Sequence, residues 1–171
     1  ALSLLDQGLQ NDTRWPSRLQ WASRLNLSLL TALIMGAEKP LDLAARLQIP
    51  RKQQRLIKKC LELQKIIESQ AIAERCLGWA PSEWCKTIEK NEIPPEAVAL
   101  ATCQGTKNWQ PLLRWWSRWR FIKSNVSAEM LIRQGWSPGP ELGKELTRLR
   151  LERIDNEINP KPLLSQTNNP H

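Results

Sequence analysis

Residues 51–69 read Arg-Lys-Gln-Gln-Arg-Leu-Ile-Lys-Lys-Cys-Leu-Glu-Leu-Gln-Lys-Ile-Ile-Glu-Ser and form the longest regular segment of the chain. The apolar side chains of this segment recur at spacings of three and four, which gathers them on one face of a helix. They are Leu56, Ile57, Cys60, Leu61, Leu63 and Ile67. Shorter segments repeat this period, strand-like alternation is absent, valine occurs only twice and tyrosine never. The sequence therefore predicts an all-α fold, a multi-helix array of short amphipathic helices with no sheet.

The charge of the chain favours a polyanionic partner. Its 171 residues include 25 Lys and Arg against 17 Asp and Glu, a net charge of +8. Such an excess attracts nucleic acid, although a basic protein without that partner carries it too. In residues 51–65 the basic side chains lie opposite the apolar face, where they either follow an RNA backbone or form a solvated helix face. They are Arg51, Lys52, Arg55, Lys58, Lys59 and Lys65.

A second basic stretch covers residues 114–123, Arg-Trp-Trp-Ser-Arg-Trp-Arg-Phe-Ile-Lys, within a helix predicted over residues 109–122. At helical spacing its tryptophans share a face with leucine and isoleucine, which favours a role in the core over base stacking. That face holds Leu112, Trp115, Trp116, Trp119 and Ile122. Arginine pairs with phosphate oxygens through a planar fork. The arginines on the other faces are therefore candidate phosphate contacts: Arg114, Arg118 and Arg120.

Residues 127–146, Ser-Ala-Glu-Met-Leu-Ile-Arg-Gln-Gly-Trp-Ser-Pro-Gly-Pro-Glu-Leu-Gly-Lys-Glu-Leu, predict two helices joined by a tight turn. Pro140 suits the first position of the second helix, and Gly139 lets a ligand approach the backbone closely. The free amides and the dipole of a helix start attract anions, and the basic residues that follow favour a nucleic-acid phosphate. The predicted contacts are Gly139, the amides of Glu141, Leu142 and Gly143, and the side chains of Lys144, Arg148 and Arg150. An ordinary helix–helix corner is the alternative.

The sequence offers no catalytic constellation. Two-metal phosphoryl transfer needs clustered carboxylates, but no two aspartates are close enough to form an Asp-x-Asp pair. Neither a Gly-Gly step nor a Gly-x-x-x-x-Gly-Lys loop occurs. The sole histidine is the terminal His171, so no Ser–His–Asp or Cys–His arrangement is available. We therefore predict no catalytic residues in this chain.

The cysteine spacing and the hydropathy argue against a zinc protein and a membrane protein. Cys60, Cys76, Cys85 and Cys103 lack Cys-x-x-Cys spacing, which argues against a zinc site. We expect no metal site, and reduced, mostly buried thiols in a cytoplasmic protein. No apolar run approaches the roughly 18 residues of a membrane span, so no membrane partner is expected. Because the chain begins at Ala1, we expect a fragment or a processed product.

Two consecutive prolines suggest an internal boundary. Asn91-Glu92-Ile93-Pro94-Pro95 stops one helix and begins the next, because proline disfavours helical backbone in the residue before it. The sequence therefore predicts a helical body region over residues 1–93 and a helical tail region over residues 94–158. From residue 159 to 171 the composition turns to Pro, Asn, Ser and Gln, which predicts a disordered C-terminal tail.

The turn at residues 135–146 carries the motif Gly-x-x-Pro-Gly-Pro-x-Leu-Gly-x-x-Leu. It resembles a signature of bacterial class II tRNA nucleotidyltransferases, the CCA-adding enzymes and their poly(A) polymerase relatives. That signature opens with Gly-Lys-Asp-Leu and closes with a Leu-Asp-Gly-type step. Here Ala128-Glu129-Met130-Leu131 and Asp155-Asn156-Glu157 stand in those places, and Asn commonly replaces Gly at a left-handed helix end. The resemblance extends over about residues 94–158.

The resemblance implies the all-helical C-terminal portion of an enzyme that adds C, A or both to tRNA 3′ ends, using CTP, ATP and Mg²⁺. Family members hold metal and nucleotide in an N-terminal head with Gly-Gly-x-x-x-Arg-Asp and Asp-x-Asp motifs, and neither motif occurs here. We therefore expect this chain to bind tRNA and to be inactive alone, its head supplied by the same or a separate polypeptide. The choice among CC, A, CCA and poly(A) addition belongs to that head.

A function of another class is compatible with the same patterns. A helical protein–protein interaction or oligomerisation module would place its apolar stripes against a partner helix. Its basic faces would then only raise solubility, and RNA would not bind.

Overall fold

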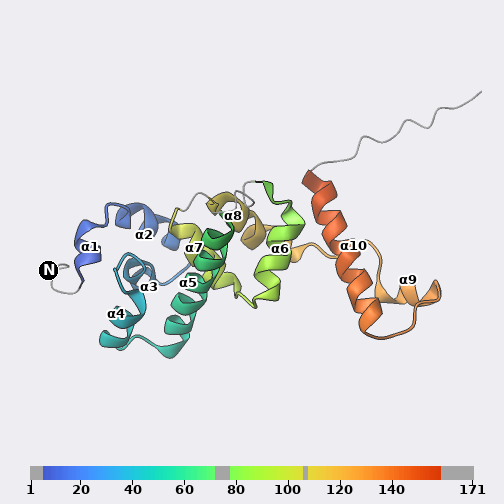
Figure 1. Cartoon of the computed structure of the whole chain (residues 1–171), viewed down its shortest axis with the longest axis horizontal. Helices are drawn as coiled ribbons and strands as arrows, with labels where there is room; N and C mark the ends of the chain where they lie inside the picture. Colours follow the sequence, from blue (N-terminus) through green and yellow to red (C-terminus); the bar gives the residue numbers. More distant parts are fainter. Residues whose placement is uncertain (1–5, 72–77, 106–107, 159–171) are drawn as a thin grey trace, which may run out of the picture. The chain divides into compact units, whose positions relative to one another are not determined.

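In a computed structural model of the chain, the described residues are 6–71, 78–105 and 108–158. Over these residues the protein is all-helical and has no strand, which confirms the predicted fold class (Figure 1). The chain divides into two compact units, residues 1–121 (unit 1) and residues 122–171 (unit 2). The step at Pro94-Pro95 falls inside unit 1, because the helix that follows it packs against the helices before it. The tail predicted over residues 159–171 lies outside the described residues.

Unit 1 is a set of short helices, and proline stands in the first two positions of several of them, where its missing N–H is not needed. In chain order the elements are α1 (Gln7–Asn11), α2 (Trp15–Arg24), α3 (Leu29–Ile34), α4 (Pro40–Arg46), α5 (Arg51–Ala71), α6 (Pro81–Lys90), α7 (Pro95–Cys103), α8 (Trp109–Ser117) and the 3-10 helix η3 (Trp119–Phe121).

Helix α7 is the centre of unit 1. All its residues from Ala97 to Cys103 are buried, and it contacts α2, α5 and α8 (Figure 1). Its mostly small side chains let these helices approach closely, and α5 turns Ile57, Cys60 and Leu63 fully inward. The apolar face predicted for residues 51–69 is therefore part of the core.

Three helices of unit 1 end in a left-handed residue other than glycine. After each of them, an apolar residue donates its backbone N–H to a carbonyl five positions earlier, which terminates the helix. The side chains of Ile49 and Ile93 are buried there, and that of Leu27 is half-buried. The left-handed residues are Asn26, Gln48 and Glu92, with φ of 55°, 51° and 51°. The closing bonds are Leu27 to Ala22 (2.8 Å), Ile49 to Ala44 (3.2 Å) and Ile93 to Ile88 (3.1 Å).

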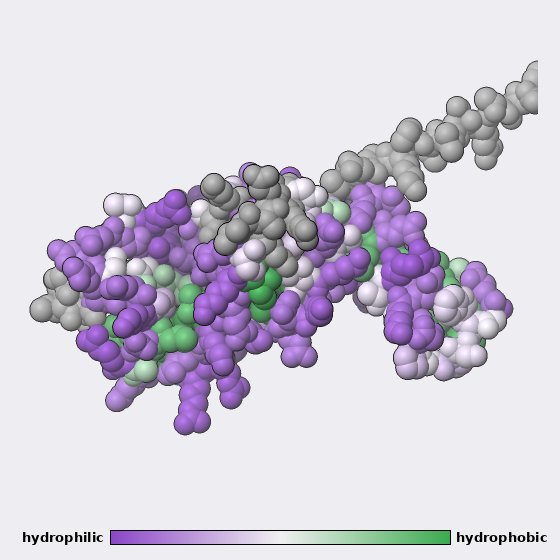
Figure 2. Space-filling view, in the orientation of Figure 1, coloured by the Kyte–Doolittle hydropathy of each residue, from purple (hydrophilic) through white to green (hydrophobic). Residues whose placement is uncertain are grey.

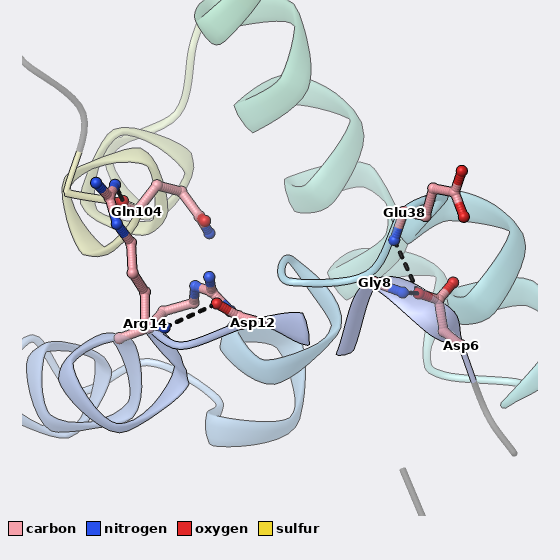
Figure 3. Close-up of polar contacts among 7 residues, drawn as sticks. Asp6, Gly8, Asp12, Arg14, Glu38 and Gln104 are labelled. Atoms are coloured by element: carbon pink, nitrogen blue, oxygen red, sulfur yellow. Dashed lines mark hydrogen bonds and ion pairs between the residues drawn. The ribbon is translucent and has the colours of Figure 1, made fainter. Parts of the chain in front are cut away.

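Polar contacts tie the first two helices to later parts of the chain (Figure 3). Asp6 Oδ1 accepts hydrogen bonds from the backbone N–H of Gly8 at 2.7 Å and of Glu38 at 2.9 Å. The bond from Glu38 is the main cause that lowers the pKa of Asp6. Arg14 Nη1 donates to the backbone oxygen of Gln104 at 3.4 Å. Segments more than 30 residues apart are thus joined through the N-terminal residues of unit 1.

A buried ion pair lies beside a glycine in unit 1. Arg18 Nη1 and Asp12 Oδ2 are 2.6 Å apart, with side chains 5% and 10% exposed. A Cβ atom at Gly36 would lie 2.2 Å from that aspartate oxygen and 2.3 Å from the guanidinium nitrogen. The absence of a side chain at position 36 therefore leaves room for the pair.

The helix predicted over residues 109–122 is wrong in its length. Helix α8 ends at Ser117, and the 3-10 helix η3 follows. Arg120 Nε donates to the backbone oxygen of Trp116 at 2.5 Å, so an arginine side chain satisfies a carbonyl that a longer helix would have used. The arginine, which the sequence assigns to RNA, thereby stabilises the helix end.

Unit 2 contains α9 (Ala128–Arg133) and α10 (Pro140–Ile158), which confirms the predicted pair of helices and the turn between them. Ser127 caps α9, because its Oγ accepts from the N–H of Met130 at 3.3 Å. Gly135 ends α9 in the left-handed conformation with φ of 99°, and the Trp136 N–H bonds back to Leu131 O at 3.1 Å.

Candidate nucleic-acid interface

The turn between α9 and α10 has an open backbone. Gly139 immediately precedes Pro140, has φ of 156° and is exposed. Within the described ranges, no heavy atom apart from the immediate chain and helix backbone lies within 4 Å of an ideal Cβ at Gly139 or Gly143. Neither glycine is therefore explained by packing, and both leave space in which a ligand could approach the main chain.

The start of α10 leaves fewer amides for a ligand than the sequence predicts. The N–H of Gly143 donates to the Gly139 carbonyl at 3.3 Å and is already used by the helix. The amides of Glu141 and Leu142 precede this first helical bond and have no acceptor inside the helix. The Leu142 side chain is buried, so this residue contributes to the core of unit 2 and could offer a ligand only its backbone.

The predicted basic residues on α10 are engaged with glutamates of the same helix. Lys144 Nζ lies 2.7 Å from Glu141 Oε1. Arg148 donates to both carboxylate oxygens of Glu145, at 2.9 and 2.6 Å, and to Glu152 at 3.1 Å. The hydrogen bonds with Glu145 raise the pKa of Arg148, and the same contact lowers the pKa of Glu145. Because these pairs are exposed, they are weak, and a phosphate could replace a carboxylate in them.

Arg150 is held by the chain of unit 2. Its Nε donates to the backbone oxygen of Ile122 at 2.7 Å, and Arg153 Nη1 donates to the backbone oxygen of Lys123 at 3.0 Å. Both arginines therefore fix the segment that enters unit 2 against α10. These contacts give Arg150 a structural role, because it holds the backbone at Ile122.

The three arginines predicted around α8 belong to unit 1 and differ in their surroundings. Arg114 and Arg118 are exposed. Arg120 is half-buried, and its guanidinium lies 5.4 Å from the ring centre of Trp116 and 4.3 Å from that of Phe121. On the apolar side of the same segment, Leu112, Trp115 and Trp119 are buried, which confirms them as core residues. The predicted contacts thus fall into two sets, one belonging to each unit.

The positive charge is concentrated in unit 1. Its sequence holds 18 of the 25 basic and 11 of the 17 acidic residues, a net charge of +7. Unit 2 holds 7 basic and 6 acidic residues, a net charge of +1. Hydrophilic residues cover most of the face of unit 1 that Figure 2 shows, with an apolar area among them. Long-range attraction of a polyanion is therefore stronger for unit 1.

The first turns of α5 carry the densest unpaired positive charge in the described part of the chain. Four exposed side chains there make no ion pair with any described residue; we call them the α5 basic face, and they are Arg51, Lys52, Arg55 and Lys58. Further along, Lys59 is paired with Glu62 at 3.0 Å. The sequence signal for this face is that no acidic residue occurs from position 51 to 61, whereas α10 alternates both signs.

The described residues hold neither a candidate metal site nor a candidate membrane span. No group of three or more His, Cys, Asp or Glu side chains in these ranges could hold a metal ion. No helix among them is long and apolar enough to cross a membrane. Comparisons of the chain with family models, with curated proteins and with solved structures give no match.

Proposed function

We propose that this chain is the tRNA-binding portion of a tRNA nucleotidyltransferase, without the catalytic head. The parent would add C, A or both to tRNA 3′ ends, and Mg²⁺ with CTP or ATP would bind to that head. The motif at residues 135–146 supports the family, and the α5 basic face supports RNA as the partner. Recognition would follow backbone shape and phosphate, because A-form RNA exposes few base edges to side chains.

The observation that carries the proposal is the α5 basic face. Arg51, Lys52, Arg55 and Lys58 are exposed on successive turns of one helix and have no carboxylate partner among the described residues. A phosphate backbone can therefore approach them without breaking an ion pair. The α9–α10 turn would add a weaker contact, because its lysine and arginine must first exchange glutamate for phosphate.

Titration of tRNA at several salt concentrations tests RNA binding. Each phosphate contact should contribute roughly 0.7 to 0.9 to the slope of log affinity against log salt. The double variant Arg55→Gln/Lys58→Gln should lower that slope by about 1.5. The matched control, Lys86→Gln/Lys90→Gln, removes two exposed charges from α6 and should leave the slope nearly unchanged. Equal losses in both variants would point to net charge alone.

A second assay tests the absence of the head. The chain is incubated with tRNA, CTP, ATP and Mg²⁺, and nucleotide incorporation is measured. We expect none, because the sequence has no clustered aspartates to hold the metal. Incorporation by the purified chain would overturn this part of the proposal.

An interaction module remains the alternative, and apolar side chains of unit 2 favour it. Met130, Ile132 and Trp136 are 49%, 42% and 38% exposed around α9. A partner protein could cover them. Self-association that does not change with salt, in a chain without tRNA affinity, would favour this function over RNA binding.

A further inference from the structure

A pocket opens in unit 1 beside the α5 basic face. Its volume is about 180 Å³, and it lies where the connection from α2 to α3 meets the first turns of α5 and α7. Pockets for drug-sized ligands usually measure roughly 300–1,000 Å³. The space is therefore suited to one small, compact group.

Both apolar and polar residues line the pocket. Leu27, Leu56 and Leu100 supply the aliphatic surface. Asn26 and Gln53 also line it, and a side-chain amide can both donate and accept hydrogen bonds. Flat apolar faces combined with a donor and acceptor edge are the properties of a nucleobase, which proteins bind in this manner when it is unpaired.

Thr31 gives a second, independent indication of a ligand. It lines the pocket, is only 4% exposed, and its hydroxyl has no hydrogen-bond partner among the described residues. A buried hydroxyl without a partner is unfavourable, and rotation about its χ1 angle could direct it toward a bound group. A ring nitrogen or carbonyl oxygen of the ligand would then supply the missing partner.

The charges around the pocket fit a nucleotide. Lys52 belongs both to the pocket lining and to the α5 basic face, and Arg51 and Arg55 flank it on α5. Glu96 on α7 also lines the pocket, and its carboxylate can accept from an exocyclic amino group. A phosphate attached to a bound base would thus lie near cations, while the base lies between leucines.

We propose that this pocket binds one unpaired nucleobase of the RNA whose phosphates follow the α5 basic face. The proposal rests on RNA binding by the chain and adds a site that distinguishes an unpaired base from a duplex. The leucines enclose the base, Asn26, Gln53 and Thr31 read its edge, and Lys52 binds the adjoining phosphate.

Methyl NMR of the full chain tests the pocket directly. The four ribonucleoside 5′-monophosphates are titrated separately, with ribose 5-phosphate as the control that lacks a base. At least one nucleotide should shift the methyl signals of Thr31, Leu56 and Leu100, and ribose 5-phosphate should not. No shift with any nucleotide, or the same shifts with ribose 5-phosphate, would overturn the proposal.

A variant that remains folded gives the second measurement. Thr31→Val keeps the shape of the side chain and removes the unpartnered hydroxyl, so stability should be maintained while nucleotide affinity falls about 5-fold. Thr87→Val, on α6 and outside the pocket, should leave affinity unchanged. Unchanged nucleotide affinity in Thr31→Val would contradict the proposed hydrogen bond from Thr31, and with it the proposal that this residue recognises the edge of the base.

A pocket-filling variant separates this inference from the proposed function. Leu56→Phe should weaken binding of single-stranded RNA at least 10-fold and leave duplex RNA binding and its salt dependence intact. If tRNA binds and Leu56→Phe affects neither form, the pocket proposal fails and RNA binding stands. If nucleotides shift the pocket methyls but tRNA does not bind, the pocket stands and the tRNA assignment fails.

Discussion

Asp12 and Arg18 form an ion pair of 2.6 Å in which both side chains are almost completely buried. Asp12 also accepts the backbone N–H of Arg14 at 2.9 Å, so one carboxylate supports the start of α2 and neutralises a buried cation. Removing only the carboxylate charge leaves that cation without compensation in the core, which is strongly destabilising.

Asp12→Asn should therefore lower the free energy of unfolding by about 3 kcal/mol. Urea denaturation followed by circular dichroism measures this change. Glu68→Gln removes one exposed charge from α5 and should change stability by less than about 0.5 kcal/mol. Similar effects of the two substitutions would contradict the special role of the buried pair.

Gly36→Ala should disturb the same ion pair by a steric clash, without changing any charge. Because its Cβ would lie 2.2 Å from Asp12 Oδ2, one of the two charged groups has to move, at a loss of about 1–3 kcal/mol. Gly78→Ala is the matched control, since no heavy atom of the described residues, its chain neighbours apart, lies within 4 Å of its Cβ position. Thermal unfolding of both variants compares them, and an unaffected Gly36→Ala would show that the pair adapts freely.

Replacing glutamine by glycine should have opposite effects at two positions. Gln48 has φ of 51° at the end of α4, so Gln48→Gly should stabilise the fold by about 1 kcal/mol. Gln64 lies inside α5, where Gln64→Gly should destabilise by about 0.5–1 kcal/mol. Changes of the same sign in urea denaturation would contradict the assigned backbone conformations.

Gly143→Ala separates stability from RNA binding. The position lies within α10 with open space around it, so alanine should stabilise the helix by about 0.5–1 kcal/mol. If RNA approaches the backbone there, the added methyl group should at the same time weaken tRNA binding. A more stable variant with unchanged tRNA affinity would exclude Gly143 from the interface.

Buried thiols should make stability fall at alkaline pH. Burial raises the pKa of Cys103 to about 11 and raises the pKa of Cys60 as well, with a further contribution from the neighbouring Cys103. In the unfolded chain these thiols ionise at about pH 8.5–9, while the folded chain retains their protons. The free energy of unfolding should therefore decrease as pH rises from about 9 to 11. Cys60→Ala/Cys103→Ala should show a smaller decrease over the same range.

The sequence predicts the helices of this protein well because their signals are local. Proline at the first position marks α10, Gly135 marks the end of α9, and the apolar period of residues 51–69 identifies the core face of α5. The end of α8 has no such local sequence signal. It depends on the side chain of Arg120 turning back to a carbonyl, a rotamer choice that periodicity does not record.

The candidate interface is predicted less well, because a basic residue in the sequence can be paired with an acidic residue in the fold and is then less available to a ligand. Arg148 and Lys144 resemble the residues of the α5 basic face when read singly, but glutamates one turn away pair with them. Spacings of three and four residues between opposite charges predict such pairing from the sequence. The pocket at Thr31 could not be found this way, because its lining comes from three segments that only the fold brings together.

Cys60 and Cys103 are buried where α5 contacts α7, so their reactivity can report how often these two helices separate. A thiol reagent can modify these residues only when the two helices separate, so the alkylation rate records how often the centre of unit 1 opens. With Cys76 replaced by serine, and Cys85 alkylation followed separately by mass spectrometry, that rate can be measured with and without tRNA. Slower modification in the presence of tRNA would mean that RNA binding steadies the helix pair on which the basic face is built.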